Sequence, residues 1–115
     1  MLKRENRLTT KFEINVTRKY GRNIPGQYFF LYALLARNYR GPAKVAIIVS
    51  NKFSKSAVKR NRIKRVFREA IRQNFDKIPQ DHWLIVYPKF SSAVKTYEEI
   101  SFDVSKTLQK IPLPR

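Results

Sequence analysis

Apolar residues follow a helical spacing in two segments of the chain. In residues 56–75 they recur at intervals of three and four, which gives one continuous stripe of Ile63, Val66, Phe67, Ala70 and Ile71. Further on, Thr96 and Glu99 form a capping box. The positions after it make a second stripe of Ile100, Val104, Leu108 and Ile111. Two amphipathic helices are therefore predicted, and Pro112 stops the second.

Strand patterns occupy most of the remaining chain. Residues 28–35 are rich in aromatic side chains, and residues 44–50 place apolar residues on both faces of an extended segment. Residues 82–87 form a nearly continuous apolar run, which indicates a strand buried on both faces. Residues 22–27 contain Pro25-Gly26 and fit a turn or a poor edge strand.

Residues 8–20 fit either a helix or a strand. A helix is suggested by apolar residues at every fourth position, at Leu8, Phe12, Val16 and Tyr20. A strand is suggested by alternation with polar residues at Phe12, Ile14 and Val16. The pattern alone leaves both open.

The elements together predict one α+β domain over residues 1–115, with helices mostly on one face of a sheet. No repeat, low-complexity tract or linker divides the chain, and its 3 glycines leave little room for a hinge. A hydrophobic fraction of 43% supports a folded core. The absence of cysteine excludes disulfides and thiolate metal sites. With no membrane-length apolar run and no signal-like N-terminal stretch, a cytoplasmic protein is expected.

The charge of the chain points to a polyanionic partner. There are 25 Lys and Arg against 8 Asp and Glu, a formal net charge of +17. Such an excess destabilises a small compact domain through self-repulsion. Nucleic acid is the first candidate partner and a membrane surface the second. Solubility alone is the weaker explanation, because small domains seldom need so large an excess.

The positive charge is concentrated in residues 52–72, where nine Lys and Arg accompany only one acid, Glu69. On a helical wheel, the side opposite the apolar stripe carries Asn61, Arg65, Arg68 and Arg72, flanked by Arg62 and Lys64. Guanidinium groups match phosphate oxygens bidentately, so this face can follow a sugar-phosphate backbone. An ordinary solvated helix would intersperse more acids.

Two features of these segments stay open. Arg60 falls within the apolar arc, so either it reaches past the core edge toward the sheet or the helix begins after it. In the aromatic strand, Tyr28, Phe30 and Tyr32 share one side and can form a stacking platform for bases. A place in the core is the better interpretation for Phe30, whereas both interpretations stand for Tyr32.

Residues suited to catalysis are scarce. His82 is the only histidine and lies at the head of a strand, where a structural role is expected. Asp76, Asp81 and Asp103 are predicted to be turn or helix-start residues. There is no carboxylate pair, glycine-rich phosphate loop or nucleophile-base signature. If the protein takes part in catalysis, the reactive groups are expected to come from elsewhere.

The segment SAVKRNRIKRVFREAIR, residues 56–72, resembles the signature of the protein component of bacterial ribonuclease P. The resemblance also covers residues 45–50 followed by Lys52, the Arg7-Leu8 opening, Gly21 and the aromatic strand through Tyr32. Weaker similarity continues through Asp81, the apolar strand, Pro88 and residues 97–100. Nearly the whole chain is covered.

This resemblance implies a fold and two binding surfaces. The fold is a small αβββαβα sandwich whose mixed sheet contains a left-handed βαβ crossover, an exception to the right-handed rule, and residues 8–20 are helical in it. The signature helix contacts the catalytic RNA through Arg60, Asn61, Arg62, Lys64, Arg65 and Arg68. A cleft between the first helix and the sheet holds the single-stranded 5′ leader of precursor tRNA and is lined by Ile14, Tyr32, Ala46, Ile48, Ser50 and Lys52.

The chain departs from the family pattern at four of these places. Asn51 stands where the first of two lysines is usual, and Tyr87 replaces a common arginine before Pro88. Ile14 and Arg18 take positions where an ungapped match expects phenylalanines. Two aromatic rings are thus missing from the leader cleft, unless Phe12 or Tyr20 replaces them through a local shift. These departures concern leader binding and leave the basic helix untouched.

By resemblance, the protein is a subunit of a ribonucleoprotein endonuclease that hydrolyses one phosphodiester bond and releases the 5′ leader. The RNA subunit supplies the active site and its Mg²⁺, and no protein motif indicates a metal site. The partners are the catalytic RNA and precursor tRNA, with neither membrane nor DNA expected. The alternatives are a structural RNA-binding protein of ribosomal type, a DNA-binding module that would need a dimer or second reading element, and a self-sufficient nuclease.

Overall fold

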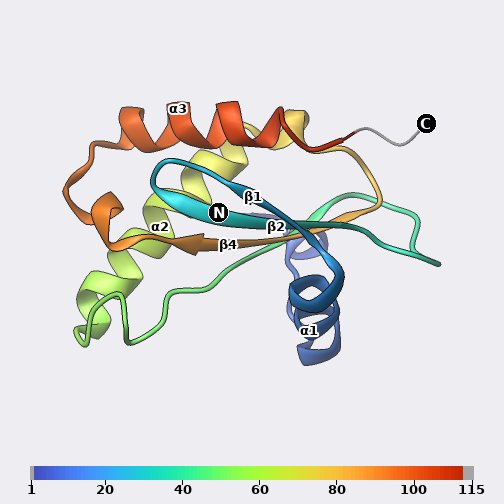
Figure 1. Cartoon of the computed structure of the whole chain (residues 1–115), viewed down its shortest axis with the longest axis horizontal. Helices are drawn as coiled ribbons and strands as arrows, with labels where there is room; N and C mark the ends of the chain where they lie inside the picture. The colour runs from blue at the N-terminus through green and yellow to red at the C-terminus, as the bar shows by residue number, and fades with distance from the viewer. Residues whose placement is uncertain (1, 113–115) are drawn as a thin grey trace.

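Four strands form one mixed sheet, in the order β1-β2-β4-β3. In this computed structural model, which describes residues 2–112, the strands are β1 Arg22–Pro25, β2 Phe29–Leu35, β3 Lys44–Ile47 and β4 His82–Pro88. The pairs β1–β2 and β2–β4 are antiparallel, and β3–β4 is parallel. The last strand in sequence therefore lies between two earlier ones (Figure 1).

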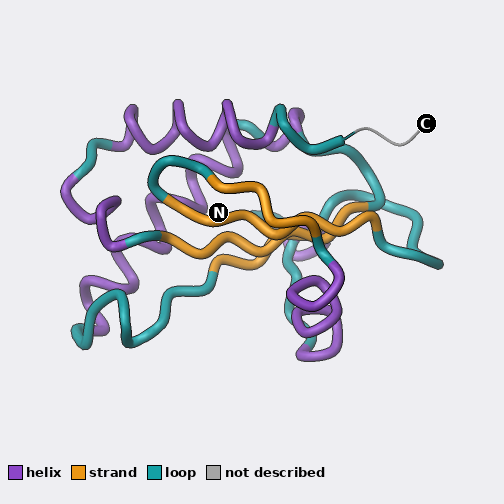
Figure 2. The backbone as a smooth tube through the Cα atoms, viewed as in Figure 1, coloured by secondary structure: helices purple, strands orange, loops and turns teal. Residues whose placement is uncertain are grey.

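Three helices cover the sheet, on both of its faces. They are α1 Lys11–Tyr20, α2 Ala57–Gln73 and α3 Tyr97–Leu108. Side chains of α2 and α3 pack in one cluster with one face of the sheet, and α1 packs with the other. Figure 1 shows α3 and α1 on opposite sides of the strands. Short 3₁₀ turns, drawn with the helices in Figure 2, span Arg4–Asn6, Phe75–Lys77 and Phe90–Val94. The predicted αβββαβα order is confirmed.

The larger core lies between the sheet and the α2–α3 layer. Phe29 and Leu31 of β2 are fully buried there, and the ring of Phe29 meets that of Phe67 edge-on at 5.5 Å between centroids. His82 to Val86 are buried on both faces of β4, as the apolar run predicts. None of the helices in residues 2–112 is both long and apolar enough to cross a membrane.

The parallel pair β3–β4 is joined by α2, so a βαβ crossover is present. Its left hand stays a prediction from the family resemblance. Regular pairing of β3 ends at Ile47, earlier than the predicted Ser50, although the Ile48 N–H still donates to the Val86 carbonyl oxygen at 2.9 Å. The chain then leaves the sheet toward the N-terminus of α2, where the Ser56 hydroxyl accepts from the Lys59 N–H.

Residues 11–20 are helical, which settles the ambiguity in the sequence pattern. Thr10 and Glu13 form a reciprocal capping box at the start of α1. Ile14 and Val16 pack toward the sheet, whereas Phe12 and Tyr20 remain 71% and 66% exposed. The regular four-residue spacing therefore indicated the correct element, although only Leu8 and Val16 of its four residues pack in this cluster.

One polar contact fixes α1 relative to the sheet. The Lys44 Nζ donates to Glu13 Oε2 at 3.1 Å and so links β3 to α1. Burial of this carboxylate opposes ionisation, but hydrogen bonds from Thr10 and Lys44 outweigh it and lower the pKa of Glu13.

At the other end of the helix, the Gly21 N–H donates to the Thr17 carbonyl oxygen at 2.8 Å. A Cβ at Gly21 would collide with that oxygen, so the tight exit from α1 needs glycine.

Asp103 has a structural role that its predicted place at a helix start did not suggest. It lies inside α3, buried, and its two carboxylate oxygens accept from the backbone N–H groups of Gln27 at 2.9 Å and Tyr28 at 2.8 Å. These hydrogen bonds hold the β1–β2 turn against the last helix. The prediction of a turn or helix-start residue was wrong for Asp103, because its carboxylate serves a turn that is 75 residues away in sequence.

Candidate RNA-binding surfaces

The basic face of α2 is held toward solvent by the packing of its opposite side. Ile63, Phe67, Ala70 and Ile71 are buried against the sheet and α3. Five of the six residues predicted to contact RNA lie on the outer side of the helix, and Arg60 does not. Asn61, Arg62 and Arg65 are exposed, while Lys64 and Arg68 are half-buried. The amphipathic pattern of residues 56–75 therefore located this face correctly.

The positive charges of this face are largely uncompensated. Within residues 2–112, no ion pair joins an acid to Arg62, Lys64, Arg65 or Arg68. Phosphates can therefore approach these four side chains without first displacing a carboxylate. The described residues thus offer a rigid row of cations, spaced by helical turns, to a polyanion.

Arg72 differs from its neighbours because Glu69 neutralises it. Arg72 Nη2 donates to Glu69 Oε1 at 2.6 Å, and its Nε donates to Oε2 at 3.0 Å. The hydrogen bonds from Arg72, and then the one from Gln73, lower the pKa of Glu69 to about 2. The carboxylate is therefore ionised at neutral pH, and Arg72 contributes little net charge to the basic face.

Arg60 has a local role at the start of α2. It is the fourth residue of the helix, is half-buried, and its Nη1 donates to the Ser54 carbonyl oxygen at 2.7 Å. Neither of the two interpretations of its place in the apolar arc is therefore correct. Arg60 fastens the first turn of the helix to the loop that precedes it.

The predicted leader cleft gathers on the opposite face of the sheet, beside α1. Ile14, Tyr32, Ala46 and Ile48 lie half-buried in one cluster with Ile85 at its base. The other two predicted residues, Ser50 and Lys52, are exposed in the loop that leads from this cluster to α2. The structure therefore brings four of the six residues together and places the other two at the end of the cleft nearest the basic helix.

Two departures from the family pattern compensate each other in this cleft. Arg18, which stands in place of a phenylalanine, donates from its Nε to Tyr87 Oη at 2.8 Å. Tyr87, which stands in place of an arginine, packs its ring edge-on against Tyr32 at 5.7 Å between centroids. One arginine and one aromatic ring are thus both present, with their positions exchanged between α1 and β4.

The aromatic surface differs from the one predicted. Phe30 is 41% exposed, so the interpretation of Phe30 as a core residue was wrong, and Lys89 Nζ lies 4.5 Å from its ring centroid. Tyr28 lies outside β2, with Lys95 near its ring. Tyr87 replaces Tyr28 as the third ring of this surface, because the pairing of β2 with β4 places Tyr87 beside Phe30. The platform therefore consists of Phe30, Tyr32 and Tyr87.

The described residues show no metal-binding cluster. Among residues 2–112, no group of three or more His, Asp or Glu is placed to hold a metal ion. His82 is buried, and its Nδ1 lies 2.8 Å from the Gln80 carbonyl oxygen, which fits the structural role expected for it.

A basic helix on one side of a small α+β sandwich and an aromatic cleft on the other are surfaces typical of an RNA-binding protein. The comparison with protein families agrees with this class, because the model described as Ribonuclease P matches residues 2–112. The chain therefore belongs to the ribonuclease P protein family, whose members take part in tRNA processing as parts of a ribonucleoprotein.

Relatives of known name cover almost the whole chain. The ribonuclease P protein component of Clostridium novyi is 29% identical over 112 residues, covering 97% of this chain and 98% of the relative. That of Clostridium kluyveri is 30% identical over 109 residues, covering 93% and 95%. Among solved structures, the ribonuclease P protein of Thermotoga maritima matches with a TM-score of 0.81 at 23% identity, over 92% of this chain and 97% of that one. The last match shows the shared fold.

Proposed function

We propose that this protein is the subunit that brings a catalytic RNA and a precursor tRNA together in a Mg²⁺-dependent ribonucleoprotein. The reaction is hydrolysis of one phosphodiester bond, which releases the 5′ leader. In this proposal the RNA subunit holds the Mg²⁺, which supplies the nucleophile and stabilises the charge that develops. The protein provides position and charge, and its own residues take no chemical step.

One observation carries the proposal: the two surfaces lie on opposite layers of the molecule. The unpaired cations are on α2, on one side of the sheet, and the aromatic cleft is beside α1, on the other. One small domain can therefore contact two RNA segments at the same time. The loop that carries Ser50 and Lys52 runs from the cleft to the basic helix and places exposed polar side chains between them.

The two surfaces suit different RNA structures. A row of arginines on a rigid helix fits phosphates of a folded RNA, because guanidinium groups recognise phosphate oxygens geometrically. Exposed or half-exposed aromatic rings fit unstacked bases, which occur in single strands. We therefore assign the α2 face to the catalytic RNA and the α1 cleft to the leader. The positive charge also lessens repulsion between the two RNAs, so less Mg²⁺ is needed.

The deciding experiment is cleavage of a precursor tRNA at low Mg²⁺ with protein alone, catalytic RNA alone, and both together. Activity that appears only in the mixture supports the proposal. If the mixture gives no gain over the RNA alone, a structural RNA-binding protein is the better explanation. Cleavage by the protein alone would mean that it has an active site of its own.

The division of labour has its own test. Arg65→Ala should weaken binding to the catalytic RNA, because it removes an exposed, unpaired cation of α2. Tyr32→Ala should mainly weaken binding of precursor tRNA, because it removes the central ring of the cleft. Each variant is titrated against each RNA. Equal losses on both RNAs would refute the assignment of the two surfaces.

A further inference from the structure

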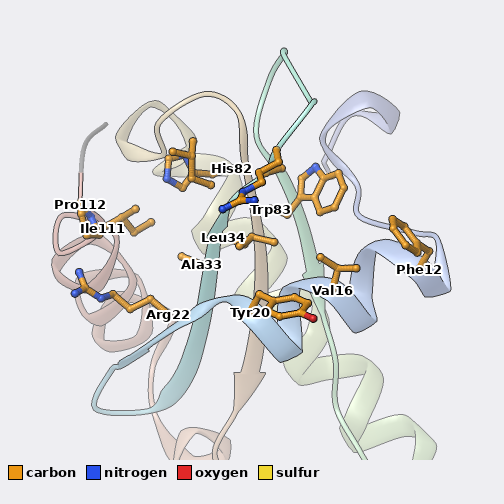
Figure 3. Close-up of a pocket in the computed structure, with 13 residues that line it drawn as sticks. Phe12, Val16, Tyr20, Arg22, Ala33, Leu34, His82, Trp83, Ile111 and Pro112 are labelled. Carbon is orange, nitrogen blue, oxygen red and sulfur yellow. The ribbon is translucent and has the colours of Figure 1, made fainter. Parts of the chain in front are cut away.

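A second groove lies on the flank of α1 that faces away from the leader cleft. It has a volume of about 950 Å³ and is bounded by α1, the end of β2 and the start of β4. Figure 3 shows Phe12, Val16 and Tyr20 along α1, and Leu34 and Trp83 on the neighbouring strands. Arg22, Ile111 and Pro112 form the far side of the groove. None of the six residues predicted for the leader cleft lines this groove. It is therefore a separate site.

Aromatic side chains on this flank are unusually exposed. Phe12 and Tyr20 lie two helical turns apart on α1, and the described neighbours leave 71% and 66% of their surfaces open. Two large rings in a row on one helix cost solubility unless something covers them. They do not replace the rings missing from the leader cleft, because Arg18, on the other flank of α1, is the residue that reaches Tyr87.

The charged residues in the lining of the groove are all positive. Arg22 and Arg37 are in its lining, and no Asp or Glu is. Within residues 2–112, neither arginine forms an ion pair. Lys19 adds a third cation, with its Nζ 5.3 Å from the centroid of the Tyr20 ring. An apolar floor with cationic ends fits a flat ring that carries a phosphate.

One residue of the lining, Trp83, carries a buried donor without a partner. The Trp83 side chain is only 9% exposed, and its indole N–H finds no acceptor among the described residues. A buried N–H without an acceptor is destabilising, and native structures rarely keep one. The nitrogen itself is covered by protein atoms, so Trp83 contributes to the groove through its ring.

We infer that this groove binds an unstacked base of single-stranded RNA. The base stacks on Phe12 or Tyr20, its phosphate lies against Arg22 or Arg37, and the Trp83 ring forms part of the floor. The inference rests on RNA being the partner, as proposed above, and adds a second contact for single-stranded RNA. The volume of the groove is within the range of small-molecule sites and accommodates a base with its sugar.

The chain contains a built-in reporter for this site, since Trp83 is its only tryptophan. The probe is a hexauridylate, titrated at low salt while the tryptophan fluorescence is followed. We expect the oligonucleotide to quench the fluorescence, and inorganic polyphosphate, which has the charge but no bases, to leave it unchanged. Equal quenching by polyphosphate, or none by the oligonucleotide, would overturn the inference. The second outcome would point to an apolar protein partner.

Three variants separate this groove from the leader cleft. Phe12→Ala with Tyr20→Ala should weaken the binding seen by quenching at least about tenfold, from the usual contribution of a stacked base. Tyr32→Ala, in the cleft, should leave that binding unchanged. The matched control is Phe102→Ala, which removes an equally exposed ring from α3 (66% exposed). All four side chains are partly or largely exposed, so thermal melts should show folded variants.

The pattern of losses decides between the two sites. If Tyr32→Ala abolishes quenching and the double variant does not, the probe binds in the leader cleft and the groove proposal fails. If the double variant loses no more affinity than Phe102→Ala, the proposal fails as well. The reconstituted cleavage assay is scored separately. Quenching as expected, with no gain in cleavage, would keep the groove and remove the proposed function.

Discussion

The unpaired cations of α2 make the salt dependence of RNA binding calculable. Each cation that neutralises a phosphate contributes about −0.9 to the slope of log K against log salt. If Arg62, Lys64, Arg65 and Arg68 each contact one phosphate, a rise from about 0.1 to about 0.4 M salt weakens their joint contribution about 150-fold. Removing one of the four leaves a weakening of about 40-fold over the same range.

The perturbation is Arg65→Gln, which keeps a polar side chain and removes one charge from an exposed position. We expect the slope for the catalytic RNA to become shallower by about 0.9, and the affinity at low salt to fall. The measurement is a filter-binding titration at five or more KCl concentrations with Mg²⁺ held constant. The difference between the slopes of the wild type and of Arg65→Gln does not depend on RNA contacts made elsewhere, because both proteins make those contacts.

A matched control lies one to two turns further along the same helix. The double variant Glu69→Gln with Arg72→Gln removes a pair whose charges already cancel. Its slope should equal that of the wild type, although an arginine is lost from the same segment. If Arg65→Gln leaves the slope unchanged, or if the double variant lowers it equally, the distinction between paired and unpaired cations is refuted.

Three further predictions concern stability and ionisation. Asp103→Ala should destabilise the fold by about 3 kcal/mol in urea unfolding, because two backbone N–H groups lose a charged acceptor; the exposed Asp76→Ala should cost less than about 0.5 kcal/mol, and equal effects would contradict this account. Gly21→Ala should cost about 1–3 kcal/mol in the same assay, since its Cβ meets a backbone oxygen; an unchanged midpoint would contradict it. A carboxyl titration by NMR should find Glu69 with a pKa of about 2. The ion pair with Arg72 is therefore fully formed at pH values above the ordinary carboxyl pKa of 4.5 and is lost as the pH falls toward 2. Arg72→Gln should return this pKa toward 4.5, and no change in it would refute the assigned cause.

Local periodicity predicted those parts of the fold that depend on local contacts. The stripe from Ile63 to Ile71 is the buried side of α2, because a helix with one apolar side has only one way to face a core. The same logic holds only in part for α1, where Val16 of the apolar stripe packs on the sheet but Phe12 and Tyr20 of the same stripe are exposed. Exposed aromatic residues cannot be distinguished from buried ones by spacing alone.

The candidate RNA-binding surfaces also divide into a part that local sequence predicts and a part that depends on contacts between distant residues. The basic face of α2 was predictable because its members are neighbours in sequence. The hydrogen bond between Arg18 and Tyr87 joins residues 69 positions apart, and the place of Tyr87 opposite Phe30 depends on the register of two strands. No local pattern contains that register. The family resemblance marked both departures, and only the contact between α1 and β4 showed that they compensate each other.

The place of β4 in the sheet has a consequence for how the protein is made. β4 is the last strand to be synthesised, yet it separates β2 from β3 and pairs with both. Until Pro88 has left the ribosome, β3 has no neighbouring strand and β2 is paired only with β1. The basic segment of α2 precedes β4 in the chain, so the nascent protein presents its cations before its sheet can close. Folding must therefore wait for the second half of the chain, with contacts between distant segments formed late.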